Sequence, residues 1–125
     1  TVDKETCDWL SKVLHLVYFK KRPDNYNPLL EKNITENGVR KLAESGKLCW
    51  QSILQRDVRG LGSSLTQTLE AWSEILPLTV PDYCQEEIQK YKDHPGAVFS
   101  GSGGGYVIIA SEEPVKGALK VKVRY

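Results

Sequence analysis

The spacing of hydrophobic residues along the chain changes from strand-like to helical and back. The segment Val13 to Phe19 is a continuous apolar run rich in β-formers, which is typical of a buried strand. Between residues 36 and 92, apolar residues recur every three or four positions, as they do in amphipathic helices. After residue 96 the strand pattern returns, and Leu119 to Tyr125 alternates apolar with basic residues, which predicts a strand with a buried face that includes Leu119 and a basic, solvated face. This order predicts an α+β fold, in which helices and strands are segregated.

Residues at the boundaries indicate where the first helices begin. Asp3 is expected to cap a short helix that turns Cys7 and Leu10 inward. A long helix is predicted to begin at a reciprocal cap between Asn33 and Glu36. Its glycine at position 46 indicates either close packing or a break. The stripe that this helix is expected to bury comprises Val39, Leu42, Ala43, Trp50, Ile53 and Leu54.

Two more helices are predicted before the final strands. One is expected to begin near Asp57 to Gly60 and to stop at Pro77. The other is expected to restart at residues 79–81, where a proline suits the first turn, and to end at residues 95–96. Trp9, Trp50 and Trp72 have helical spacing within apolar stripes, so we expect them in the core.

The whole chain, residues 1–125, is expected to form one domain. We predict a mostly antiparallel sheet of about four strands, covered on one face by three to four helices. With 40% hydrophobic and 26% charged residues the composition is globular, and a formal net charge of +1 predicts no nucleic-acid or membrane partner.

The cysteines and the start of the chain indicate a compartment. Cys7, Cys49 and Cys84 are widely spaced and include no C-x-x-C pair, so we expect buried thiols in a reducing environment. No apolar stretch approaches the ~20 residues that span a bilayer, and no signal peptide is visible. The expected localisation is therefore cytoplasmic, and no metal site is predicted.

The tract Gly101-Ser102-Gly103-Gly104-Gly105 is the main candidate for chemistry. It joins two apolar runs, so it is predicted to be a loop between strands. Backbone N–H groups without side chains can approach an anion closely, and phosphate is the commonest such ligand. The alternative is a bulge or a loose hairpin turn, which glycine also serves. A competing segment, residues 60–64, fits the apolar period of the second long helix and is predicted to be a helix start.

The stretch Gly96 to Tyr106 resembles the third motif of the GHMP small-molecule kinases, which reads roughly Gly-Ala-Lys-(apolar)-Thr/Ser-Gly-Ala-Gly-x-Gly-Gly and lies in their C-terminal domain. Leu14 to Tyr18, the polar turn after it and the order of the helices are similar to the sugar-kinase branch, closest to bacterial heptose-phosphate kinases and fucokinases. Val98 stands at the motif's lysine position, and the glycine run is one residue shorter.

The resemblance implies a ferredoxin-like C-terminal domain that binds substrate and closes the cleft of an ATP-dependent sugar or sugar-phosphate kinase. ATP and Mg²⁺ would bind in the full-length enzyme, with none expected on this domain alone. The partner would be the N-terminal kinase domain of the same parent chain, which carries the ATP loop, so the isolated chain is expected to be inactive, with no catalytic residue of its own. The residues implied to bind phosphate and acceptor are Ser100, Gly101, Ser102, Gly103, Gly104 and Gly105.

Weaker candidates for contact with the sugar are Arg22, Asn25 and Tyr26, in the turn after the first strand. Their alternatives are a solvated surface charge for Arg22 and turn chemistry for Asn25 and Tyr26. The alternative function is a non-catalytic α+β module that binds a small anion or a partner, with the glycine tract as a structural turn. His15 is expected to be a hydrogen-bonded core histidine, His94 a helix-end residue, and Glu112-Glu113 a solvated pair.

Overall fold

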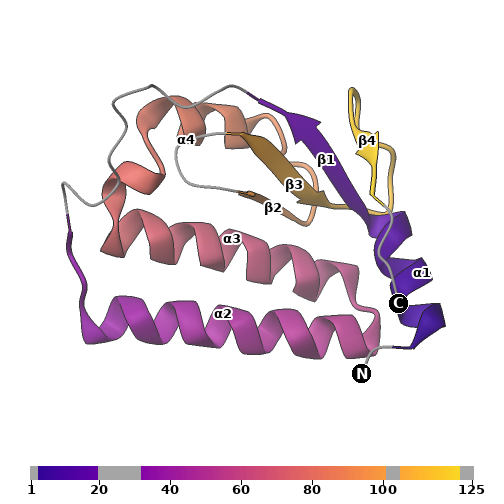
Figure 1. Ribbon diagram of the computed structural model, residues 1–125, viewed down its shortest axis with the longest axis horizontal. Coiled ribbons are helices and arrows are strands. Elements are labelled where there is room, and N and C mark those ends of the chain that lie inside the picture. Colours follow the sequence, from indigo (N-terminus) through magenta and orange to yellow (C-terminus); the bar gives the residue numbers. More distant parts are fainter. Residues whose placement is uncertain (1–2, 20–31, 101–104, 122–125) are drawn as a thin grey trace.

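The computed structural model of the chain describes residues 3–19, 32–100 and 105–121. The α+β class and the antiparallel sheet expected from the sequence are confirmed (Figure 1). The predicted strand over residues 119–125 is described only as a two-residue strand, and residues 122–125 lie outside the described ranges. The elements are α1 (Lys4–Val13), β1 (Leu14–Tyr18), α2 (Glu36–Gln55), α3 (Val58–Ile75), the 3-10 helix η1 (Pro77–Thr79), α4 (Asp82–Gln89), β2 (Gly96–Phe99), β3 (Tyr106–Ala110) and β4 (Leu119–Lys120).

Side-chain caps begin the first three helices. Asp3 caps α1 as predicted, accepting a hydrogen bond from the Thr6 N–H at 2.8 Å, and hydrogen bonding from Thr6 holds the pKa of Asp3 below its ordinary value. The predicted start of α3 near Asp57 is confirmed, and the Asp57 side chain caps the helix by accepting from the Gly60 N–H at 3.1 Å. The predicted Asn33–Glu36 cap of α2 is wrong. Thr35 is the cap, because its hydroxyl accepts from the Gly38 N–H at 3.0 Å.

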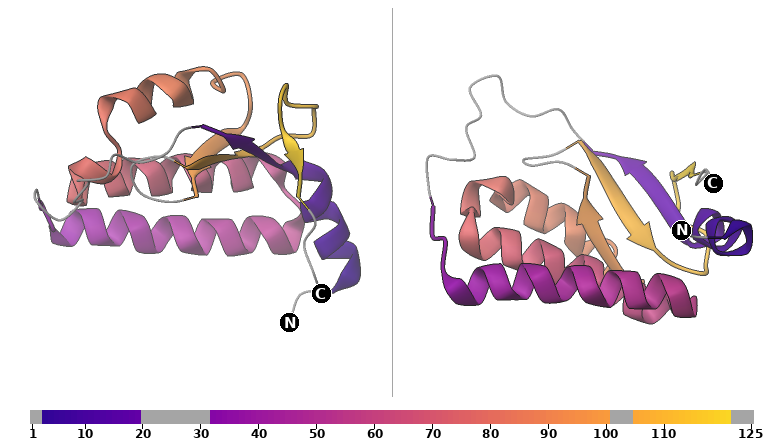
Figure 2. Two further views of the ribbon diagram at one scale, coloured as in Figure 1. Left: turned by 45° about the horizontal axis from the view of Figure 1, so that its top comes forward. Right: turned by 60° about the horizontal axis from the view of Figure 1, so that its bottom comes forward.

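The sheet has the strand order β2-β3-β1-β4, with antiparallel pairing throughout. Because side chains alternate along a strand, Ala97, Phe99, Val107 and Ile109 share one face. They form the main core with Cys84 of α4 and with neighbouring half-buried aromatic and aliphatic side chains. Leu69 of α3 packs against the same core, so both α3 and α4 contribute to it (Figure 2).

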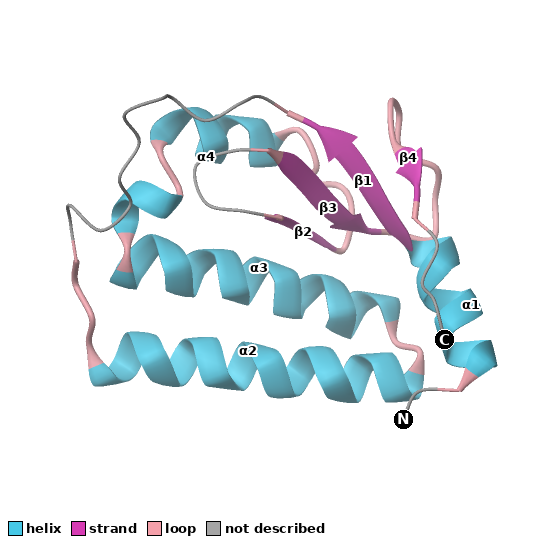
Figure 3. Cartoon of the chain, in the orientation of Figure 1, coloured by secondary structure: helices cyan, strands magenta, loops and turns pink. Residues whose placement is uncertain are grey.

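The two long helices pack side by side, and α3 rather than α2 contacts the sheet (Figure 3). Gly62 of α3 and Gly96 of β2 meet so closely that a Cβ on Gly96 would fall on the Gly62 carbonyl group. The α2–α3 contact itself runs through small residues, including a 2.9 Å hydrogen bond from the Thr68 hydroxyl to Ser45 Oγ.

The buried face of α2 differs from the predicted one. The helix buries Gly38, Ser45 and Ser52 against α3, whereas Val39, Trp50 and Leu54 are exposed. Leu42 and Ile53 are half-buried and Ala43 is exposed. The hydrophobic period locates a helix but does not say which face its neighbour takes, and here close packing selected the small residues. Trp72 of α3 is also exposed, so the prediction that all three tryptophans are in the core is wrong for Trp50 and Trp72.

The face of the sheet opposite α4 is partly open. Leu16 and Ile108 are half-buried on it, and Tyr18, Tyr106 and Leu119 are exposed. The expectation that Leu119 lies on the buried face of the last strand is therefore wrong. The predicted burial of thiols is confirmed for Cys7 and Cys84, and Cys49 is half-buried.

Candidate functional site

The glycine tract leaves the sheet at the end of the β2–β3 hairpin. The Ser100 N–H donates to the Tyr106 carbonyl at 2.9 Å, which continues the pairing of the two strands to the edge of the tract. Gly105 has φ +91°, a conformation that glycine adopts far more readily than other residues. Its carbonyl accepts a hydrogen bond from the Phe19 N–H at 2.8 Å. The end of β1 therefore lies directly beside the end of the glycine tract.

The hydrogen bond from the Phe19 N–H to the Gly105 carbonyl relates the two groups of site residues predicted from the sequence. Of the six in the glycine tract, Ser100 and Gly105 are described, and Gly101 to Gly104 lie outside the described residues. Arg22, Asn25 and Tyr26 also lie outside them. The two segments leave the described fold at neighbouring points, Phe19 and Gly105, at one end of the sheet.

An aromatic pair that the sequence analysis did not single out marks the same end. Tyr18 and Tyr106 are register partners in β1 and β3, and their ring centroids are 5.5 Å apart in an edge-on arrangement. Both rings are exposed. The sequence could have indicated this pair through the positions of its members, because Tyr106 follows the glycine tract and Tyr18 ends the first apolar run.

The competing glycine segment, residues 60–64, lies in the first turns of α3 and not in a loop. Leu61, Gly62 and Ser64 are buried there, and Asp57 caps the helix. The prediction of an ordinary helix start is therefore confirmed.

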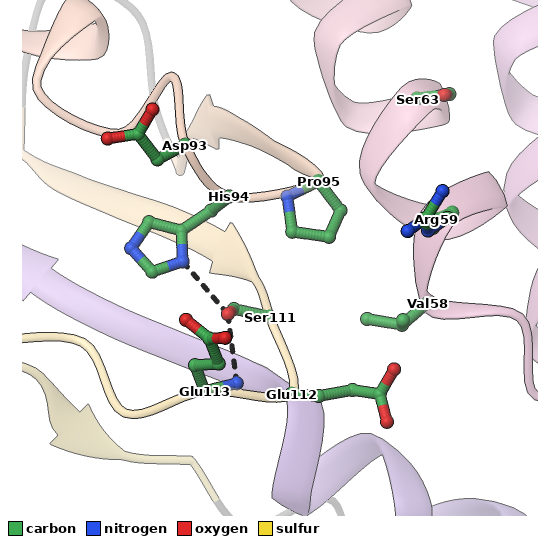
Figure 4. A pocket seen from close by; sticks show the side chains of 9 residues that line it. All are labelled: Val58, Arg59, Ser63, Asp93, His94, Pro95, Ser111, Glu112 and Glu113. Carbon is green, nitrogen blue, oxygen red and sulfur yellow. Dashed lines mark hydrogen bonds between the residues drawn. The ribbon is translucent and has the colours of Figure 1, made fainter.

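A cavity of about 480 Å³ lies at the opposite end of the sheet (Figure 4). His94 and Pro95 directly precede β2, and Ser111 directly follows β3, so the five residues of β3, roughly 17 Å, separate this cavity from the glycine tract. The first turns of α3 form the other wall. The lining residues are Val58, Arg59, Ser63, Asp93, His94, Pro95, Ser111, Glu112 and Glu113.

Ser111 holds this end of the sheet together. Its side chain is buried, with the residue only 2% exposed, and its Oγ lies 2.8 Å from His94 Nδ1 and accepts from the Glu113 N–H at 3.1 Å. Its carbonyl lies 3.0 Å from His15 Nε2, and its N–H donates to the Val13 carbonyl at 2.8 Å. Both histidines of the chain thus bond to one serine, and the expectation that His15 is hydrogen-bonded is confirmed.

The chemistry available in the cavity is that of polar binding. Ser111 is buried and hydrogen-bonded through its N–H, carbonyl and hydroxyl, which suits a structural role better than an open nucleophile. Arg59 and the carboxylates of Asp93, Glu112 and Glu113 are exposed around it. Their exposure agrees with the solvated pair expected at Glu112-Glu113, but their convergence with His94 was missed. The signal was the hairpin register, which brings residues 94–95 next to residues 111–112.

Glu87 contributes to the raised pKa values of two nearby residues, Lys90 and Tyr91. Glu87 of α4 is buried and pairs with Lys90, with Glu87 Oε1 and Lys90 Nζ 2.7 Å apart. This hydrogen bond raises the pKa of Lys90, and burial, followed by the charge of Glu87, raises the pKa of Tyr91. The Tyr91 hydroxyl donates to Glu87 Oε2 at 3.4 Å. These interactions therefore lie within α4 and the turn that follows it.

Comparison with known proteins identifies no family for this chain. In the described part of the chain, no three His, Cys, Asp or Glu residues are grouped so as to hold a metal ion. No described helix combines the length and apolarity needed to cross a membrane. No protein-family model and no curated protein matches the sequence.

Proposed function

We propose that this chain is the C-terminal, substrate-binding and cleft-closing domain of an ATP-dependent sugar or sugar-phosphate kinase of the GHMP type. The order of the elements supports this proposal, since one strand, three helices and a glycine-linked strand pair follow in the sequence that the resemblance implies. The proposal includes the ferredoxin-like fold that the resemblance implies for this domain.

The observation that carries the proposal is the position of the glycine tract. It joins two strands instead of opening a helix, it ends in a residue with positive φ, and its end lies beside the exit of β1. In the proposed role, backbone N–H groups of Gly101 to Gly105 and the hydroxyls of Ser100 and Ser102 bind the phosphate and acceptor side. Arg22, Asn25 and Tyr26 contact the sugar.

The proposed chain provides half of a cleft. Phosphoryl transfer depends on positioning and on neutralising the charge of the transferred group, normally with Mg²⁺. In the proposal, ATP and Mg²⁺ are held mainly by the N-terminal domain of the parent chain, so this chain alone transfers no phosphoryl group.

Two measurements test these claims separately. The first is an assay of the chain alone with ATP, Mg²⁺ and a panel of sugars, where we expect no turnover, and clear turnover would refute the half-cleft role. The second follows backbone amides by NMR while inorganic phosphate or ATP is added. We expect shifts in residues 100–106 and none in residues 93–95 and 111–113, which lie at the other end of the sheet.

A pair of glycine variants makes the second measurement specific. Gly103→Val should abolish the shifts, because a side chain keeps the anion away from the backbone. Gly46→Ala is the control, since a Cβ there meets no atom within 4 Å, and it should leave the shifts unchanged. A loop whose amides do not respond to phosphate or ATP would overturn the role of the tract.

A second candidate is a non-catalytic module whose glycine tract is a structural turn. Val98 at the lysine position of the motif favours it, and so does a polar cavity remote from the tract. The same NMR titration separates the two functions, because this module would respond to ligands at residues 93–95 and 111–113 and not at the tract.

A further inference from the structure

The outward face of α2 carries large apolar side chains that the described fold does not cover. Val39, Trp50 and Leu54 are 48%, 47% and 55% exposed. Together with the exposed Ala43 and Gly46 they are spaced by three or four residues and lie on one side of the helix, which we call the outer stripe. An amphipathic helix normally buries its large apolar residues. In α2 the buried residues Gly38, Ser45 and Ser52 are small, and the large apolar ones are exposed.

Gly46 has no explanation within the described chain. It lies in the middle of a 20-residue helix, where glycine is less favourable than alanine, and a Cβ added to it meets nothing within 4 Å. It therefore relieves no contact inside the fold. With Ala43 one turn before it and Trp50 one turn after it, Gly46 leaves a low, smooth area beside a large ring.

The outer stripe is complementary to itself when two copies run antiparallel. Its large side chains, Trp50 and Leu54, lie in the C-terminal half of α2, and its smaller ones lie in the N-terminal half and the middle. A two-fold axis between positions 46 and 47 would place Trp50 opposite Ala43 and Leu54 opposite Val39 of the other copy, since both pairs of numbers add up to 93. A parallel arrangement would place each residue against its own copy, ring against ring.

We propose that the outer stripe of α2 is the contact surface of a symmetric, antiparallel homodimer. Such an isologous interface uses every contact twice. A patch of this size is on the order of a few hundred Å² per copy, which is below the ~800 Å² of a standard interface. The dimer is therefore expected to be weak and transient. This proposal rests on the outer stripe of α2 and not on the glycine tract that carries the proposed kinase function.

Sedimentation of the chain from about 5 to about 500 µM tests the dimer. We expect a reversible monomer–dimer equilibrium and at least a tenfold weaker association for Trp50→Glu, since it puts a charge opposite Ala43. Leu119→Glu is the matched control, because Leu119 is also an exposed apolar residue, at 57% against 47% for Trp50, but lies on β4, and it should leave the Kd unchanged. Thermal unfolding of each variant checks its fold, and Trp50→Ala replaces Trp50→Glu if the charge disturbs folding.

Oxidative cross-linking tests the register independently. Gly46→Cys places a thiol next to the two-fold axis, and we expect a disulfide-linked dimer that the native cysteines do not form. Glu44→Cys, on another face of the same helix, should not cross-link. A chain that stays monomeric at 500 µM would refute the proposal. Association that Leu119→Glu weakens, or that survives Trp50→Glu and Trp50→Ala, would also refute it.

Discussion

At Gly62 and Gly96, α3 meets β2 without room for a side chain. A Cβ on Gly96 would fall on the backbone of Gly62, and a Cβ on Gly62 would fall on Pro95 and on the Gly96 nitrogen. The contact is backbone against backbone, so no rotamer change can relieve it. Since Pro95 borders the cavity and Gly96 begins β2, this contact determines where the hairpin sits on α3.

Replacing Gly96 or Gly46 by alanine should change the free energy of unfolding in opposite directions, because the surroundings of the two glycines differ. Gly96→Ala is expected to lower the free energy of unfolding by about 1–3 kcal/mol, because the backbone must shift to admit the methyl group. Gly46→Ala is expected to raise it by up to about 1 kcal/mol, because the site is open and helical. Urea unfolding at a few micromolar chain measures both. A Gly96→Ala variant as stable as the parent would contradict the close contact.

Among the elements, α2 and α3 show how far the hydrophobic pattern leads. Their positions, their ends and the Asp57 cap follow from local sequence, since capping and helical periodicity act within a few residues. The buried face of α2 does not follow, because Ser45 and Ser52 are buried only where another helix approaches closely. Cys49 and Ile53 of α2 reach the smaller core cluster around Leu61 only at its C-terminal end.

Substitutions to leucine on the two faces of α2 test which face is buried. Ser45→Leu is expected to destabilise the chain by about 1–3 kcal/mol, because Ser45 is 1% exposed and its Oγ accepts from Thr68. Ala43→Leu, two positions earlier on the exposed side, should stay within about 0.5 kcal/mol of the parent. Unfolding in urea at low concentration compares them. The reverse order would mean that the predicted stripe, and not the small-residue face, contacts α3.

For the whole molecule, the layers differ in how much apolar surface they bury. β3 lies between β2 and β1, and its Val107 and Ile109 are fully buried in the core with α4. α2 is outermost and contacts α3 through small side chains. Regions with few buried apolar contacts open at lower free energy than the core.

Native-state hydrogen exchange should therefore rank the layers. We expect amides in the middle of α2 to exchange through a partial opening that costs less free energy than the opening of β3, whose amides should require global unfolding. NMR-detected exchange at increasing urea, with the chain kept at low concentration, gives both values. Equal protection of α2 and β3 would show that the two layers unfold as one unit.

Sequence alone determined the order of the elements, most of their boundaries, the Asp3 cap and the placement of the glycine tract between two strands, because these depend on residues close together in the chain. Only the tertiary structure decided which face of α2 is buried, that Phe19 lies beside Gly105, and that His15 and His94 both bond to Ser111. These outcomes depend on segments as many as 96 residues apart. Which of them meet is settled by packing and strand register, which no local pattern encodes.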